Sequence, residues 1–142
     1  LMDCAAGLGR EAMNALLAST EILLITNPDW PSVADALRTA KIAKANNKKI
    51  LGVVVNRVRG KPYELKKEEI EELLELPVIA EIPEDKNMSR AISAKLPIVE
   101  FYPDSPASIE IRRLAHWLCD LPFEYKKPKL NLIERLVRWM LR

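Results

Sequence analysis

Residues 21–26 read EILLIT, and this near-continuous apolar run decides the fold class of the chain. A strand that carries apolar residues at nearly every position is buried on both faces, as happens in parallel sheets covered by helices. A second run of this kind, KILGVVVN, occupies residues 49–56. A third, shorter run spans residues 76–82, with Pro77 near its start, where proline is tolerated. The sequence therefore predicts three buried strands.

Helical patterns separate and follow these strands. They span residues 9–19, 32–46, 66–74 and 87–95, and a last one runs from the cluster at 102–106 to about residue 120. Alternating strands and helices indicate βαβ units, whose right-handed crossovers place helices on both faces of a parallel sheet. The prediction is an α/β fold, and three strands make up about half of such a sheet.

The composition fits a globular domain and excludes several other classes. The chain has 142 residues, of which 49% are hydrophobic and 30% charged, and its net charge is +2. This charge is too small to indicate a nucleic-acid-binding protein. Cys4 and Cys119 are far apart in the sequence and form no zinc-binding pattern. No apolar run is long enough to span a bilayer.

Residues 1–9, LMDCAAGLG, place an acid after an apolar end and before two glycines. This order is typical of the carboxyl edge of an α/β sheet, where ligands bind. A carboxylate there can hold Mg²⁺ through its water shell. The alternative is an ordinary strand end with a polar turn, and these nine residues alone favour that alternative. Leu1 and Met2 read as the end of a strand, so we expect that a further segment precedes them.

The C-terminal residues change character and divide the chain into three parts. Residues 1–120 form the predicted domain, and residues 121–129, with two prolines and three lysines, read as a linker. Residues 130–142 predict an amphipathic helix. Its apolar side chains recur at helical spacing, with Trp139 near the boundary of the face: Leu132, Ile133, Leu136, Val137, Met140 and Leu141.

A short, cationic, amphipathic helix behind such a linker is the pattern of a membrane-surface anchor. The alternative is a terminal helix docked on the domain's own core. We favour the membrane because the linker separates the helix from the domain and because tryptophan suits a membrane interface.

Five segments, taken in order, resemble the MinD/ParA family of deviant Walker A P-loop ATPases, and most of all its archaeal MinD-type members. They are DCAAGLG at 3–9, TNP at 26–28 with PSVADA at 31–36, VVVNR at 53–57, IPED at 82–85 and the C-terminal amphipathic helix. Many members have proline where this chain has Ala5 or Ala6. The chain matches the C-terminal part of the family, so the resemblance implies the C-terminal half of a P-loop NTPase-like sheet.

The resemblance also implies roles for individual residues, with ATP and Mg²⁺ as cofactors. Asp3 would hold Mg²⁺ through water, and Gly7 would let the switch II loop respond to the γ-phosphate, so both serve catalysis. Asn56 would hydrogen-bond the adenine edge. Arg57 and the loop that contains Pro83, Glu84 and Asp85 would lie beside the base. The alternatives are a strand-end cap for Asn56 and ordinary loop polarity for Arg57, Glu84 and Asp85.

For the whole protein the resemblance implies an ATPase that dimerises when ATP is bound and attaches reversibly to the inner face of the cell membrane from the cytoplasm. There it would position division machinery or other cargo. A second hypothesis is a non-catalytic, membrane-associated interaction module derived from such an ATPase. A third is a ParA-type DNA-binding partner, but the amphipathic helix argues against a nucleic-acid partner. Trp30 and Trp117 are predicted to be packing residues.

The 142 residues contain no G-x-x-x-x-G-K-[ST] segment and none of its deviant forms. The phosphate loop and its lysines provide most of the electrostatic stabilisation in phosphoryl transfer. We therefore expect no ATP hydrolysis from these residues by themselves, and activity only if a preceding P-loop half exists.

Overall fold

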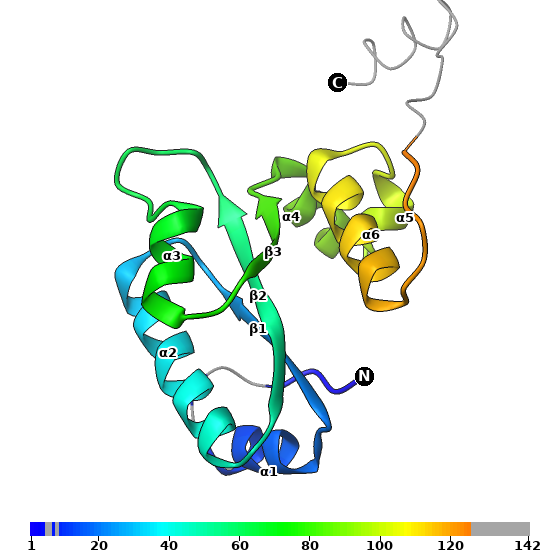
Figure 1. Ribbon diagram of the computed structural model, residues 1–142. Helices are drawn as coiled ribbons and strands as arrows, with labels where there is room; N and C mark the ends of the chain where they lie inside the picture. The colour runs from blue at the N-terminus through cyan, green and yellow to red at the C-terminus, as the bar shows by residue number, and fades with distance from the viewer. Residues whose placement is uncertain (5–6, 8, 126–142) are drawn as a thin grey trace, which may run out of the picture.

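A computed structural model describes residues 1–4, 7 and 9–125 of the chain. Its centre is a parallel sheet of three strands in the order β1 (Glu21–Thr26), β2 (Lys49–Val58) and β3 (Val78–Pro83). Figure 1 shows β2 as the central strand, with β1 and β3 at the two edges. The predicted strands and their parallel arrangement are thus confirmed.

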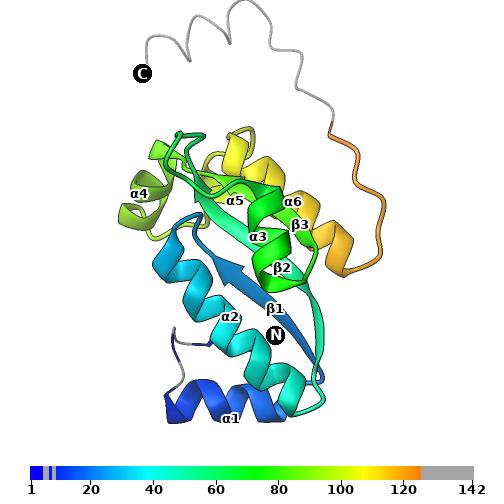
Figure 2. The same cartoon turned by 60° about the vertical axis from the view of Figure 1, so that its left-hand side comes forward.

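Helices cover the two faces of this sheet. On one face α2 (Trp30–Ala45) packs on β1 and β2, and α3 (Lys67–Leu74) packs on α2 and β3. On the other face α6 (Pro106–Leu118) packs on β3, together with α4 (Lys86–Ser93) and the short α5 (Ile98–Phe101). Figure 2 shows α1 (Arg10–Ala18) at the amino ends of the strands. The predicted α/β fold is confirmed, whereas the C-terminal amphipathic helix at 130–142 lies outside the described residues.

The core forms because β2 buries alternate side chains on opposite faces. Val53 and Val55 join a cluster with Val33 of α2 and Ile70 of α3. Val54, between them, points to a second cluster with residues of β3, α4, α5 and α6: Ile82, Ala91, Ile98 and Ala107. All three valines of β2 are at most 1% exposed, so this strand has the two-sided burial that its sequence predicts.

Gly52 lets β2 and β3 approach each other closely. A Cβ atom at this position would lie 2.8 Å from the carbonyl oxygen of Pro77 and 2.9 Å from Cγ2 of Ile79. The register between β1 and β2 also shifts next to Gly52, because Ile22 pairs with Ile50 but Leu23 pairs with Gly52. The missing side chain of Gly52 thus lets β3 lie close against the central strand.

Four features differ from the sequence prediction. Ile25 in β1 is 64% exposed, because α6 covers the sheet near β3 and leaves part of β1 open. Residues 1–4 form no strand, since they pair with none of the strands in the described part of the chain. The helix α5 was not expected, and β2 continues two residues beyond Asn56, to Val58.

None of the helices in the described ranges is both long enough and apolar enough to cross a membrane.

Candidate functional site at the carboxyl edge of the sheet

The predicted base-binding residues meet where β2 and β3 end. Asn56 pairs with Ile82, and Val58 pairs with Pro83, so the chain leaves both strands at the same edge. Arg57 and Glu84 therefore come into contact although they are 27 positions apart. The carboxyl edge is also where open α/β sheets bind their ligands.

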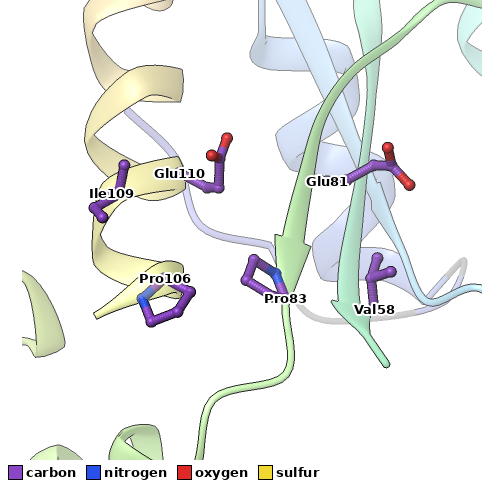
Figure 3. A pocket seen from close by; sticks show the side chains of 6 residues that line it. All are labelled: Val58, Glu81, Pro83, Pro106, Ile109 and Glu110. Carbon is purple, nitrogen blue, oxygen red and sulfur yellow. The ribbon is translucent and has the colours of Figure 1, made fainter. Parts of the chain in front are cut away.

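Two hollows lie at this edge. Pro83 and Val58 line an open groove of about 430 Å³ between β3 and α6, together with Glu81, Pro106, Ile109 and Glu110 (Figure 3). A smaller hollow of about 160 Å³ lies at the carboxyl ends of β1 and β2. Its walls come from the end of β2 and from the loops after β1 and β2: Asn27, Pro28, Asp29, Arg57, Arg59, Tyr63 and Glu64. The predicted base-binding residues thus border different hollows, with Pro83 at the first and Arg57 at the second.

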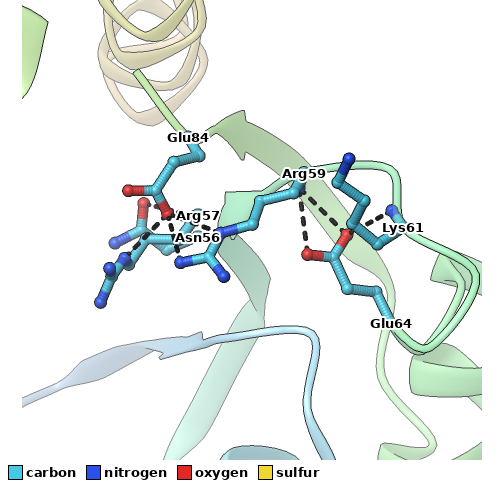
Figure 4. Close-up of polar contacts among 6 residues, drawn as sticks. All are labelled: Asn56, Arg57, Arg59, Lys61, Glu64 and Glu84. Carbon is cyan, nitrogen blue, oxygen red and sulfur yellow. Dashed lines mark hydrogen bonds and ion pairs between the residues drawn. The ribbon is translucent and has the colours of Figure 1, made fainter. Parts of the chain in front are cut away.

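Glu84 holds two arginines at the edge of the sheet (Figure 4). Its Oε2 accepts hydrogen bonds from Nε of Arg57 at 3.1 Å and from Nε of Arg59 at 3.2 Å. The hydrogen bond from Arg57 is the main reason why the pKa of Glu84 is lowered. The hydrogen bond to Glu84 in turn raises the pKa of Arg59. One carboxylate is thus held between two guanidinium groups.

Arg57 adopts a backbone conformation that is rare for residues other than glycine. Its φ angle is 60°, in the left-handed region, and its N–H donates a hydrogen bond of 3.0 Å to Oδ1 of Asn56. Such strained positions persist only where surrounding contacts hold them, and they cluster at functional sites. Among the described residues the NH₂ group of Asn56 has no hydrogen-bond partner, and an amide NH₂ can donate to a base acceptor.

The loop after β2 is closed by a carboxylate that the sequence analysis missed. Glu64 accepts backbone N–H hydrogen bonds from Arg59 at 3.0 Å and from Lys61 at 3.1 Å. The loop is thereby shaped so that Arg59 faces Glu84. The signal in the sequence is weak, because a glutamate five positions after an arginine in a polar loop has many possible partners.

Asp85 has a structural role in the described part of the chain. Its Oδ1 accepts from the N–H of Asn87 at 2.9 Å, which caps α4, and its Oδ2 accepts from the N–H of Ala107 at 3.4 Å, at the start of α6. Partial burial acts to raise the pKa of Asp85, but hydrogen bonds from Asn87, Ser105 and Ala107 together lower it below its ordinary value. One carboxylate thus joins two helix N-termini. Its predicted place beside the base stays a prediction.

The predicted catalytic residues lie near the start of the chain. Asp3 is exposed, and Gly7 is exposed with a φ angle of 88° and no atom within 4 Å of a Cβ built on it. No group of three acidic, histidine or cysteine side chains in the described ranges could hold a metal ion. A role through the water shell of Mg²⁺ needs only one carboxylate, so Asp3 fits that role, which stays a prediction.

The two tryptophans predicted to be packing residues do not belong to the buried core. Trp30 at the start of α2 is 62% exposed, and Trp117 near the end of α6 is 48% exposed.

A model of the CobQ/CobB/MinD/ParA nucleotide-binding domain matches residues 12–98. The chain belongs to this family. The match runs from α1 to the start of α5 and includes the carboxyl edge with its arginine–glutamate cluster. The resemblance inferred from the short motifs is thereby confirmed.

Individual MinD/ParA relatives agree with this assignment. An uncharacterized ATP-binding protein of Methanocaldococcus jannaschii is 36% identical over 140 residues, which are 97% of this chain and 53% of the relative. The cell division ATPase MinD of Pyrococcus furiosus is 32% identical, with a TM-score of 0.77 over 84% of this chain and 51% of that one. The chain thus spans about half the length of the relatives that it matches.

A third comparison concerns a ligand. The septum site-determining protein MinD of Pyrococcus horikoshii, solved in complex with Mg-ADP, is 29% identical with a TM-score of 0.76, over 82% of this chain and 48% of that one. This fold therefore occurs in a protein that binds a magnesium nucleotide.

Proposed function

We propose that residues 1–142 form the base-binding edge and the membrane-binding end of a MinD-like ATPase. The observation that carries the proposal is the cluster at the carboxyl ends of β2 and β3. It brings together a strained Arg57, the amide of Asn56 and the carboxylate of Glu84. The Mg-ADP complex of the P. horikoshii relative supports the choice of nucleotide.

Each residue at this edge would make a different contact with ATP. Asn56 would direct its NH₂ group, and a lone pair of its oxygen, to the adenine edge. Glu84 would hold the side chains of Arg57 and Arg59 beside the base, so that they do not cover its site. Pro83 would contact the apolar face of the base. When bound, ATP with Mg²⁺ would supply the phosphoryl group and its charge neutralisation. Asp3 would hold a water of the Mg²⁺ shell, and Gly7 would give the following loop the freedom to respond.

At the level of the cell, the proposal is a protein that dimerises when ATP is bound and associates reversibly with the inner face of the membrane through residues 130–142. The sequence of this segment supports the proposal, since one face is apolar and the other carries Arg135, Arg138 and Arg142. Two copies in a dimer would bind far better than one, through effective concentration. Such a protein would position division machinery or other cargo from the cytoplasm.

A second candidate is a non-catalytic membrane-associated interaction module, which the amphipathic pattern of residues 130–142 also fits. The two candidates differ in their dependence on nucleotide. The proposed ATPase would bind the membrane in response to ATP, whereas a module of the second kind would bind it equally with and without ATP.

The test is a nucleotide titration of the protein in its full natural length, by calorimetry, with Asn56→Ala beside wild type. Asn14→Ala, on the exposed side of α1, is the matched control. We expect Asn56→Ala to weaken binding of ATP about tenfold or more, which corresponds to about 1.4 kcal/mol, and the control to leave it unchanged. Equal affinities of the two variants would contradict the base-binding role.

A further inference from the structure

We propose that residues 121–125 form a strap that fixes the point at which residues 126–142 leave the domain. Figure 1 shows this segment in orange, running back along α6 from the last turn of the helix toward its first turn. The strap brings the chain to the end of α6 that lies beside the carboxyl edge of the sheet. Its contacts involve neither nucleotide nor membrane, and only its consequence for the membrane rests on the proposed function.

The chain reverses its direction after α6 through a Schellman motif. Asp120 has a φ angle of 54°, in the left-handed region. The N–H of Leu121 donates to the carbonyl of His116 at 2.8 Å, and the N–H of Asp120 donates to that of Trp117 at 3.2 Å. These are the two hydrogen bonds that define the motif. Pro122 comes next and cannot continue the helix, so the chain turns back.

Phe123 is the first of two anchors that hold the strap on α6. Its ring meets the ring of His116 edge to face, with 5.2 Å between centroids, and the guanidinium of Arg113 lies 5.7 Å from its centroid. Nδ1 of His116 also donates a hydrogen bond of 2.8 Å to the carbonyl oxygen of Pro122. One turn of α6 thus binds both the backbone and the ring.

Tyr125 is the second anchor. Its ring lies under the guanidinium of Arg112, 6.0 Å from the ring centroid, and its hydroxyl lies 3.5 Å from Oδ1 of Asp104. Arg112 is itself held in place, because it donates to the backbone carbonyls of Ser108 and Pro103. The surface that receives Tyr125 is therefore fixed by contacts within the domain.

The spacing of the two anchors matches the helix beneath them. Phe123 and Tyr125 are half-buried, whereas Glu124 between them is exposed, as in an extended segment with alternate side chains on one side. Two extended residues advance about 6.6 Å. His116 and Arg112 are four positions apart, which is about 6 Å along a helix. An extended chain that runs antiparallel to α6 therefore places both rings on their partners at once.

The strap ends next to the carboxyl edge. Asp104, which meets the hydroxyl of Tyr125, stands just before α6. The N–H of Ala107, in the first turn of this helix, donates to Asp85, which follows β3 and is the neighbour of Glu84 in the arginine–glutamate cluster. Residue 126 therefore leaves the domain on the side where the nucleotide is proposed to bind.

The strap also sets the length of the tether that carries the proposed membrane-binding segment. With the strap closed, residues 126–129 alone join the domain to residue 130, and they span at most about 14 Å. With it open, the tether includes residues 120–129 and spans up to about 35 Å. Contacts between exposed aromatic and cationic side chains are individually weak, so the strap can open without unfolding the core.

The experiment measures the distance between two nitroxide labels by double electron–electron resonance in the protein of full natural length. One label is on Ser89→Cys, exposed on α4, and the other is on Lys126→Cys, directly after the strap. All other cysteines, Cys4 and Cys119 among them, are replaced by serine. The test variant is Phe123→Ser. Its matched control is Leu121→Ser, which removes a 57% exposed apolar side chain from the same segment but neither anchor.

We expect a narrow distance distribution in the parent and in the control, and a distribution about twice as wide or more in Phe123→Ser, because a released tether behaves as a flexible chain. A parent distribution as wide as that of Phe123→Ser would overturn the strap. So would a control as wide as Phe123→Ser, or a Phe123→Ser distribution as narrow as that of the parent. Near-identical circular dichroism spectra of the three proteins check that the domain stays folded.

Vesicles of anionic phospholipid keep this result separate from the fate of the membrane role. In a dimer that binds through two segments, lengthening each tether from four to ten residues should weaken vesicle binding about fourfold in Phe123→Ser relative to Leu121→Ser. Leu136→Glu tests the membrane role itself. If it binds vesicles as wild type does, the membrane role falls, while the label distances, measured without lipid, still decide whether the strap exists.

Discussion

Nε of Arg57, at the end of β2, donates a hydrogen bond of 3.1 Å to Glu84, which follows β3 and lies 27 positions later in the sequence. This contact ties the two loops that leave the central and outer strands. The contact forms at a residue with a strained backbone, since the φ angle of Arg57 is 60°. One contact between side chains therefore holds the two strand ends together at the carboxyl edge.

Replacing Glu84 with Gln should weaken nucleotide binding without unfolding the protein. Glutamine keeps the shape of the side chain but removes the charge that holds Arg57 and Arg59. Exposed ion pairs contribute little to stability, so the urea midpoint should stay close to that of wild type. A calorimetric titration with ATP measures the expected loss of affinity. A large fall in the urea midpoint would instead identify Glu84 as a purely structural residue.

Asp85 should stabilise the fold in a pH-dependent way. Removing a capping carboxylate as in Asp85→Ala costs about 1 kcal/mol. The pKa of Asp85 is lowered from its ordinary value of 3.8, so its contribution is present above pH 3.8 and is lost as the pH falls through the lowered pKa. Urea unfolding should show a constant gap between wild type and variant at neutral pH, and a closing gap below pH 3.8. Asp85→Asn is the control, because asparagine can still cap α4 but does not titrate. The gap in unfolding free energy between Asp85→Asn and Asp85→Ala should therefore stay constant as the pH falls.

Gly52→Ala should destabilise the domain for two reasons: the new Cβ would clash with a neighbouring strand, and the positive φ angle of residue 52 disfavours alanine. The added Cβ would meet the carbonyl oxygen of Pro77 at 2.8 Å, and overpacking of this kind costs about 1–3 kcal/mol. Gly60→Ala is the control, since Gly60 also has a positive φ but no atom near its Cβ position. Chemical denaturation of both variants separates the clash from the backbone strain, and equal losses would exclude the clash.

The difference in burial between two isoleucines predicts different effects of their replacement. Ile70 of α3 is 0% exposed and Ile25 of β1 is 64% exposed. Ile70→Ala should therefore cost about 2–5 kcal/mol through a cavity, whereas Ile25→Ala should change the free energy of unfolding by about 0.5 kcal/mol or less. A large loss for Ile25→Ala would show that another surface covers this side of β1 in the protein as it exists.

The strands could be predicted because their information is local. The run VVV at 53–55 buries side chains on both faces, as the pattern indicates. The exposure of Ile25 could not be predicted, since it depends on where α6 packs. An apolar residue in a strand gives the same sequence pattern whether or not a helix covers it. The family motifs located Asn56, Arg57 and Glu84, but not the roles of Arg59 and Glu64. Those roles arise from the shape of a loop, which no periodicity reveals.

Arg57→Gly should separate stability from binding at the same position. Glycine adopts a left-handed backbone without the steric penalty of about 1–2 kcal/mol that other residues incur, although its greater freedom in the unfolded state offsets about 0.4–1 kcal/mol of this gain. The variant should thus be as stable as wild type or slightly more stable, while its affinity for ATP falls because Glu84 loses a partner. Denaturation and calorimetry on the same samples measure both quantities. Arg57→Lys is the control. It keeps the charge and the backbone strain but removes the Nε–H group that donates the 3.1 Å hydrogen bond to Glu84. If Arg57→Gly lowered stability and left ATP binding unchanged, the strain at Arg57 would serve the fold rather than the site.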